Sequence, residues 1–326
     1  MRAPALRIRV DEFKSLRRDP SQTKRVRPPV MLLSLIIPTY NRARSLQRVL
    51  QSVDRLECPG GEAEIIVVNN NSSDETGDIL GTERRRARKF PVIALLEKRQ
   101  GKASALNCGL RAAKGNIVLI LDDDIVAHPQ CLVKHLECYQ NSVFDAMQGR
   151  VLPGVDPEGR AADPRRIREY NIPIVDYGDE IREIRGMIAT NVSFKREVFE
   201  KVGLYDPRLG AGAVGFGEDT EYSLRIRKAG FKIGYTPHAI VYHELDPARY
   251  GRRYNRRVQY LKGLSRSIYR RDSIIFNVVP NLLANCIRMG IYKTLGKPQK
   301  AYKTEGRVMK YLGYLAGKWR AISGKE

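Results

Sequence analysis

The sequence predicts an α/β domain with a mostly parallel central sheet and flanking helices, followed by a basic helical segment. Between residues 32 and 121, short apolar runs alternate with segments whose apolar residues have helical spacing. Three of the apolar runs lead directly into clusters of polar residues. Such alternation is typical of parallel strands joined by crossover helices, and these sheets bind ligands at the carboxyl ends of their strands.

The first half of this domain is the most regular. Its expected strands are rich in Ile, Leu and Val, as buried strands are. The apolar side chains of residues 43–56 recur every three or four positions, which predicts a helix, and a second helix is expected at 102–113. The expected strands are the apolar runs 32–37, 64–68, 91–96 and 117–121.

Beyond residue 130 the pattern is mixed. Scattered prolines and glycines predict an irregular connection over residues 145–190. The elements expected after it are helices at 195–202 and 218–229, and short strands at 232–236 and 239–243 on either side of Pro237.

The net charge of +22 is concentrated in two flanks. Residues 1–30 hold nine Lys and Arg against three Asp and Glu, and residues 246–326 hold nineteen against four. The sequence is therefore expected to comprise a basic arm (1–30), a nearly neutral globular domain (31–245) and a basic helical tail (246–326). Basic flanks favour a polyanionic partner, either nucleic acid or an anionic membrane surface.

Cysteine content and hydropathy indicate a cytoplasmic location. The five cysteines form no CxxC pair and are interpreted as reduced thiols. No apolar run follows the basic N-terminus before Met31, so a cleaved signal peptide is not expected. The apolar segment 273–292 is interrupted by five polar or proline residues, which favours an interfacial helix over a clean membrane span.

Three consecutive carboxylates, Asp122, Asp123 and Asp124, directly follow an apolar run. They repel one another unless a cation lies among them, and hard oxygen ligands suit Mg²⁺ or Mn²⁺. Such a metal could bridge a diphosphate and stabilise its leaving charge. A solvated acidic turn is an equally good interpretation of these three residues alone.

Three further features carry candidate chemistry. Glu218 and Asp219 follow a Gly-rich stretch (210–217); alone they are more typical of a helix cap, and the alternative is a general base on a mobile loop. Lys102 precedes a helix, where a cation and backbone N–H groups can bind phosphate. His243 ends an expected strand and could join carboxylates around a divalent ion, although a lone histidine is more often structural.

Taken together, these pieces resemble the family 2 glycosyltransferases, which have the GT-A fold, a Rossmann-like nucleotide-binding fold. The similarity runs from about Leu33 to His243, roughly two thirds of the chain. The pieces that carry it, in order, are SLIIPTYNR (34–42), EIIVVNNNSSDET (64–76), GKASALNCGLRAAKGNIVLILDDD (101–124), TNVSFKREVFEKVGLYDPRLG (190–210) and GEDTEYSLRIRKAGFKIGYTPHAIVYHE (217–244).

The resemblance implies roles for individual residues. Asp219 matches the catalytic base of the family's ED motif, and Asp122 and Asp124 match its DxD motif. Asp124 and His243 would hold the metal, and Glu218 and Asn191 are expected on the acceptor side. The residues expected to bind the donor are Pro38, Thr39, Asn41, Asn70, Lys102, Asp122 and Asp123.

The implied reaction is an inverting transfer of a hexosyl or deoxyhexosyl group from a nucleotide-diphosphate sugar, dependent on Mn²⁺ or Mg²⁺. The expected acceptor is a hydroxyl of a glycan or a lipid-linked molecule in cell-surface polysaccharide synthesis. Asn69 and Asn70 replace aspartates that are common in this turn, so the preferred base need not be uracil. The sequence lacks the QxxRW motif of processive synthases, which favours a non-processive enzyme.

The basic tail suggests where the protein acts. Residues 249–271 carry nine Lys and Arg interleaved with tyrosines, which favours an anionic membrane surface. We therefore expect a peripheral protein at the inner face of the cell membrane, with the C-terminal helices as a candidate homodimer contact. The alternatives are a nucleotidyltransferase that makes a nucleotide-sugar and a basic nucleic-acid-binding protein. Because the polar clusters already resemble a donor pocket, no nucleic acid is expected as a partner.

Overall fold

The computed structural model describes residues 32–58, 62–86, 89–140, 143–156, 159–161, 163 and 172–324. The basic arm expected over residues 1–30 lies outside these ranges.

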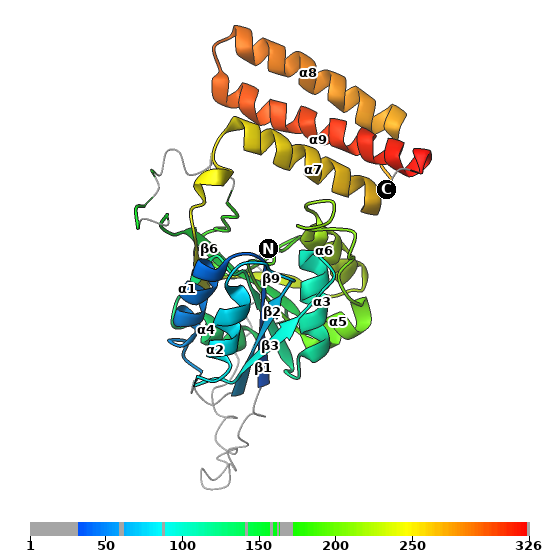
Figure 1. Cartoon of the computed structure of the whole chain (residues 1–326). Coiled ribbons are helices and arrows are strands. Elements are labelled where there is room, and N and C mark those ends of the chain that lie inside the picture. The colour runs from blue at the N-terminus through cyan, green and yellow to red at the C-terminus, as the bar shows by residue number, and fades with distance from the viewer. Residues whose placement is uncertain are drawn as a thin grey trace, which may run out of the picture. The chain divides into compact units, whose positions relative to one another are not determined.

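The first half of the domain has the expected alternation of strands and helices (Figure 1). All neighbouring strands in it are parallel, with β1 between β2 and β4 and with β3 beside β2. The carboxyl ends of these strands therefore share one rim of the sheet. The elements are β1 (Leu32–Thr39), α1 (Ala43–Val53), β2 (Glu62–Asn69), α2 (Thr76–Glu83), β3 (Val92–Leu96), α3 (Lys102–Ala112) and β4 (Ile117–Leu121).

The second half extends the sheet in mixed directions. The strand order is β3-β2-β1-β4-β8-β6-β9-β5, with β7 paired to β9. Strand β8 runs antiparallel to both β4 and β6, whereas β6 and β9 are parallel. The elements are β5 (Ile125–Ala127), α4 (Cys131–Gln140), β6 (Ala146–Pro153), β7 (Arg182–Glu183), β8 (Asn191–Lys195), α5 (Arg196–Val202), α6 (Glu218–Lys228) and β9 (Ile233–His243).

Two sequence expectations were wrong in this half. The stretch 145–190 is not wholly irregular, because it contains β6 and β7. Strand β6 was not recognised in the sequence because polar side chains such as Gln148 interrupt its apolar pattern. Gln148 is buried, and its side-chain amide donates hydrogen bonds to backbone carbonyls. The two short strands around Pro237 form one strand, β9, whose pairing with β6 shifts register opposite that proline, which has no N–H to donate.

Helices cover both faces of the sheet (Figure 1). Leu50 of α1, Leu80 of α2 and Leu132 of α4 belong to the apolar core on one face. Leu106 of α3 and Tyr222 of α6 belong to the core on the other. These two cores fix the strands, and therefore the rim, in place.

The tail is helical, as expected. It comprises η4 (Pro247–Arg249), α7 (Arg252–Tyr269), a π-helical turn η5 (Ile274–Val278), α8 (Val279–Thr294) and α9 (Pro298–Ser323). Helix α9 packs between α7 and α8 (Figure 1). Glycines allow the close approach of α7 and α9: a Cβ atom on Gly263 would overlap the carbonyl of Lys310, and one on Gly313 would overlap that of Tyr260.

Helix α8 leaves an apolar face exposed. Large apolar side chains recur at every fourth position from Ile275 to Leu295, and Ile287 in this series is 65% exposed. Phe276, next to the first member of the series, is 85% exposed. By length and composition, residues Ile274–Thr294 could cross a membrane, and 11% of the apolar window is buried within the protein. This length and composition do not decide between a span and the interfacial helix expected over 273–292, which stays a prediction.

Candidate functional site

The acidic run lies at the carboxyl end of β4, as the sequence predicted. Strand β5 follows it at once and pairs with the end of β9, which places Ile125 opposite His243. One ligand atom from each of Asp122, Asp124 and His243 lies within 4.8 Å of the others. Two strands that are far apart in the sequence thus bring together two carboxylates and an imidazole, a suitable donor set for a divalent metal.

The environment of His243 fixes its tautomer. Nδ1 lies 2.8 Å from the backbone oxygen of Glu244, which can only accept, so Nδ1 carries a proton. In the neutral ring, Nε2 then points a lone pair at Oδ1 of Asp124, 3.3 Å away. Two facing lone pairs need a proton or a cation between them, and this backbone-oriented imidazole has the arrangement typical of metal ligands.

Two arginines also contact the acidic run. Arg42, just after β1, pairs with Asp124 and with Asp123, and Arg249 of η4 lies 3.2 Å from Asp124. Burial alone would raise the pKa of Asp124, but a proton on His243, together with the charges of Arg42 and Arg249, outweighs burial and holds that pKa below its ordinary value. Asp124 is therefore a carboxylate at any physiological pH.

Lys102 binds the first carboxylate of the run. Its Nζ lies 2.5 Å from Asp122 Oδ1, while Thr190 donates a hydrogen bond to Oδ2. Burial would lower the pKa of Lys102, but Asp122, Asp219 and Glu218 outweigh it and keep the ammonium charged. Lys102 is the first residue of α3, so its charge adds to the N-terminal partial charge of that helix.

The Gly-rich loop brings Glu218 and Asp219 to the same rim. Lys102 N donates to the carbonyl of Ala211, and a Cβ atom on Gly212 would lie 2.9 Å from the Cα atom of Gly101. Only glycine permits this backbone contact. The loop then leads into α6, whose first two residues are Glu218 and Asp219.

Asp219 is the second acidic residue at the start of α6. Its Oδ1 atom is shielded from solvent and has no hydrogen-bond partner. Burial raises its pKa, and the Lys102 charge and the N–H of Ala189 offset part of that rise. An oriented carboxylate with an unused oxygen, in a site that already holds charged groups, can accept a proton from a bound hydroxyl.

The charge balance of the rim favours a bound cation. Burial, together with neighbouring carboxylates, raises the pKa of Asp123 to about 7 and that of Glu218 to about 8. The rim brings together five carboxylates (Asp122, Asp123, Asp124, Glu218 and Asp219) and four neighbouring cations (Arg42, Lys102, Arg249 and Lys262), so the carboxylates outnumber the cations. A divalent cation at Asp122, Asp124 and His243 would supply the missing charge.

The residues expected to bind the donor have different positions. Thr39 is buried beside Asp123, and Pro38 is buried within β1, opposite Val68. Asn41 is exposed at the rim, where its Oδ1 accepts from the N–H of Ser73. This contact joins the loops that follow β1 and β2.

Asn70 does not fit a direct contact with the base. Its Nδ2 donates to the carbonyls of Glu97 and Arg99, its Oδ1 accepts from the N–H of Gly101, and only 4% of the residue is exposed. The amide therefore positions the chain that leads to Lys102. An aspartate could not make the two donated bonds, which gives a physical reason for asparagine here.

Asn191 does not fit the expected acceptor role either. It is fully buried in β8, with Nδ2 donating to the carbonyls of Arg150 and Ala239 and Oδ1 bonded to Nε2 of His135. Its side chain joins three elements in the interior. We therefore correct that expectation and keep Glu218 and Asp219 as the acidic pair at the rim.

Arg42 and Arg249 were not expected at this site. Both contact Asp124, yet they lie 82 and 125 positions from it. Arg42 directly follows Asn41 in the quoted motif, so its place after a strand was a usable signal. Arg249 offered none beyond the general basic character of the tail.

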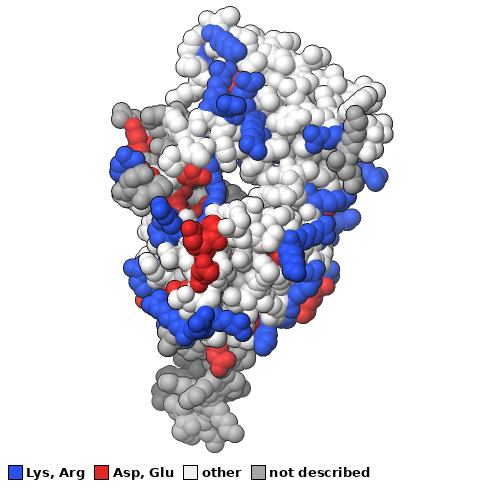
Figure 2. Space-filling model, in the orientation of Figure 1, with Lys and Arg blue, Asp and Glu red and all other residues white. Residues whose placement is uncertain are grey.

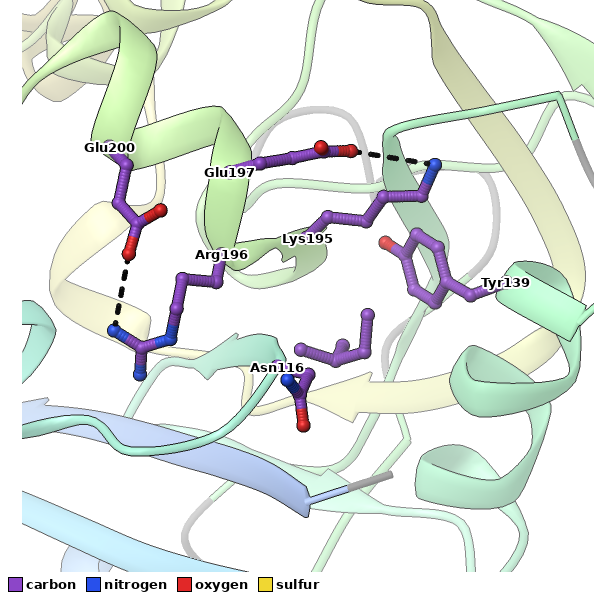
Figure 3. Close-up of a pocket in the computed structure, with 7 residues that line it drawn as sticks. Asn116, Tyr139, Lys195, Arg196, Glu197 and Glu200 are labelled. Carbon is purple, nitrogen blue, oxygen red and sulfur yellow. Dashed lines mark ion pairs between the residues drawn. The ribbon is translucent and has the colours of Figure 1, made fainter. Parts of the chain in front are cut away.

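A separate cavity lies at the opposite end of β4. It has a volume of about 400 Å³ and includes Asn116 and Ile117, which precede and begin that strand. Figure 3 shows its charged side chains paired with one another, Lys195 with Glu197 and Arg196 with Glu200. It is therefore distinct from the rim that holds the acidic run.

Comparison with known proteins agrees with this arrangement. Residues 34–203, more than half of the chain, match the model of the family described as Glycosyl transferase family 2. A probable glycosyltransferase, YdaM, of Bacillus subtilis (strain 168) is 28% identical over 240 residues, which cover 71% of this chain and 54% of that protein. The poly-beta-1,6-N-acetyl-D-glucosamine synthase of Staphylococcus epidermidis is 28% identical over 236 residues, covering 71% and 54%. The chain thus spans about half the length of these two relatives.

A solved structure shares the fold. The mannosyltransferase of Pyrobaculum calidifontis, in complex with GDP-Man and Mn²⁺, superimposes with a TM-score of 0.60 and 19% identity, covering 91% of this chain and 88% of that one. The fold is therefore that of the GT-A glycosyltransferases. Given this fold and the match to the family model, the chain belongs to glycosyltransferase family 2.

Proposed function

We propose that this protein is an inverting glycosyltransferase that moves a sugar from a nucleotide-diphosphate donor to a hydroxyl of an acceptor. The observation that carries the proposal is Asp219, whose shielded and unpaired Oδ1 lies in the same charged cluster as Lys102 and Asp122. Such a base takes the proton of the attacking hydroxyl as its oxygen bonds to the anomeric carbon. One displacement, with the nucleoside diphosphate leaving from the opposite side, inverts the configuration.

The metal proposal rests on Asp122, Asp124 and His243, which fit Mn²⁺ or Mg²⁺ in donor type and spacing. A bound divalent ion would stabilise the negative charge of the departing diphosphate. Arg42 and Lys102, which pair with Asp124 and Asp122 at the same rim, would contact the diphosphate as well. The mannosyltransferase noted above was solved with Mn²⁺ and its nucleotide-sugar, which supports this proposal.

The donor and acceptor are proposed by class. A hexosyl or deoxyhexosyl donor and a glycan or lipid-linked acceptor in cell-surface polysaccharide synthesis fit a family whose relatives include a polysaccharide synthase. We propose non-processive transfer because the sequence has no QxxRW motif.

A panel of nucleotide-diphosphate sugars with purified protein and Mn²⁺ tests the function. We expect nucleoside diphosphate release from one donor, with release abolished by a chelator and strongly reduced by Asp124→Ala. A Val143→Ser variant changes an exposed side chain outside the cluster and serves as a matched control. Metal-independent release, or release that Asp124→Ala leaves intact, would refute the proposed metal site.

We further propose that the protein acts at the inner face of the cell membrane, with α8 against the lipid. In Figure 2 the face over the C-terminal helices is largely free of charged side chains, apart from basic ones along one side. The exposed apolar residues of α8 and the basic tail are the combination that binds anionic bilayers peripherally. A homodimer through these helices is the competing use of this face.

A further inference from the structure

A second cavity opens at the start of the helical tail. It has a volume of about 550 Å³ and is lined by Arg252, Arg253 and Arg256, all in the first two turns of α7. We refer to these three residues as the arginine pocket. A cavity lined by guanidinium groups suits an anion with several oxygens, because each group presents a planar fork of N–H donors.

The pocket has an excess of positive charge. Glu305 of α9 binds Arg252 through two hydrogen bonds of 2.6 and 2.8 Å, and Arg256 lies 3.6 Å from the same carboxylate. Among the described residues, no carboxylate pairs with Arg253. Glu305 thus pairs with two of the three guanidinium groups, and Lys293 of α8 adds to the positive potential at this carboxylate. A ligand with two negative charges would balance the pocket.

Glu305 also orients the pocket. Its side chain is 9% exposed, and the neighbouring Arg252 holds its pKa below the ordinary value, so it stays ionised. The paired arginines are therefore held by a fixed anion on a packed helix, while Arg253 remains available. Donors held in position in this way bind a ligand at a lower entropic cost than free surface arginines.

The pocket lies close to the catalytic rim along the chain. Arg249, which contacts Asp124, is three residues before Arg252. Helix α7 then continues past the Gly-rich loop, where Lys262 lies 5.5 Å from the ring of Phe216. Residues 249–262 thus contact both the acidic run and the Gly-rich loop, and the pocket lies within this same segment.

We propose that the arginine pocket binds the diphosphate group of a lipid-linked acceptor and so selects a phosphorylated acceptor over a neutral glycan. This inference rests on the proposed transferase function and names the acceptor class for it. The dianionic charge and the exposed apolar face of α8 in the same helical tail both fit an acceptor that combines a diphosphate with a hydrocarbon chain.

Direct binding of geranyl diphosphate to the full-length protein tests the proposal. Titration calorimetry in the presence of a chelator keeps metal-dependent binding out of the measurement. We expect the Kd of geranyl diphosphate to rise at least about tenfold in Arg253→Gln and further in Arg253→Gln/Arg256→Gln, because each lost charge-assisted contact removes about a decade of affinity. The matched control is Arg257→Gln, an exposed arginine of the same helix outside the pocket, which should bind like the wild type.

Three results would overturn the proposal. The first is an unchanged Kd in the double variant, and the second is equal loss in Arg257→Gln. The third is inorganic pyrophosphate binding as tightly as geranyl diphosphate, which would assign the pocket to a free anion. Because the measurement needs no turnover, it is separate from the transferase proposal, which fails only if no donor is cleaved or bound.

Discussion

At the residue scale, the pKa values of two carboxylates at the same rim shift in opposite directions. Cationic neighbours outweigh burial at Asp124 and keep it ionised, as a metal ligand must be. Burial and a like-charged neighbour raise the pKa of Glu218 instead. Environment, not residue type, therefore separates the proposed metal ligand from the acidic pair at the start of α6.

The raised pKa of Glu218 makes stability depend on pH. Its pKa rises from 4.5 in the unfolded chain to about 8 in the folded protein, so the folded state binds the proton more tightly. Stability from this group is fully present below about pH 4.5 and is lost as the pH rises to about 8. We expect Glu218→Gln to remove this loss. In thermal denaturation between pH 5 and 9, the Tm of the variant relative to that of the wild type should rise as the pH increases. The same pH dependence of Tm in both proteins would contradict the raised pKa of Glu218.

Replacing Asn70 by aspartate, which has the same shape, should destabilise the protein. In Asn70→Asp, the carbonyls of Glu97 and Arg99 lose their donors and face a carboxylate. The expected cost is about 1–3 kcal/mol of unfolding free energy. Chemical denaturation measures it, with Asn71→Asp, at the exposed next position, as the control. Equal effects of the two substitutions would show that the amide does not hold this loop.

At the scale of elements, the parallel half of the sheet was predictable and the mixed half was not. Runs such as residues 117–121 are buried on both faces, so their composition alone marks them as strands. Strand β6 carries a buried Gln148 whose hydrogen-bond partners are backbone groups of Ile188 and Asn191, about 40 positions away. The residues next to Gln148 in the sequence therefore do not predict that it is buried. The convergence of Asp124 and His243 followed from strand ends and family resemblance, whereas the ion pair of Arg249 with Asp124 depends on tertiary packing.

The crossing of α7 and α9 depends on glycine. A methyl group at Gly313 would overlap the carbonyl of Tyr260, so Gly313→Ala should lower the unfolding free energy by about 1–3 kcal/mol. Gly290 in α8 has open space around its Cα atom, so Gly290→Ala should stabilise the helix by up to about 1 kcal/mol. Denaturant titration of both variants checks the opposite signs; a stabilised Gly313→Ala protein would show that the helices are not in close contact.

At the scale of the whole molecule, charge and apolar surface are separated by position in the chain. The tail after residue 246 carries most of the excess positive charge, and α8 carries the exposed apolar face. The acidic run, Lys102 and the Glu218–Asp219 pair lie at one rim of the GT-A domain, and the tail contacts that rim through Arg249 of η4. This arrangement would let a bilayer present acceptors to the same side of the enzyme.

Membrane binding should therefore need both charge and apolar contact. We expect the protein to co-sediment with vesicles that contain phosphatidylglycerol and to be released as salt increases, because counterions screen the basic residues. Leu283→Ser/Ile287→Ser should weaken binding, whereas Val143→Ser, in the catalytic domain, should not. Loss of a dimer on gel filtration in the α8 variant, with vesicle binding intact, would assign this face to self-association instead.

Single-turnover sugar transfer by Asp219→Asn is the sharpest test of Asp219 as the base of a metal-dependent transfer. With the donor identified by the panel and donor affinity measured separately, we expect a rate about 10²–10⁴-fold below the wild type and an almost unchanged donor Kd. Sugar transfer at the wild-type rate by the Asp219→Asn enzyme would show that Asp219 is not the base.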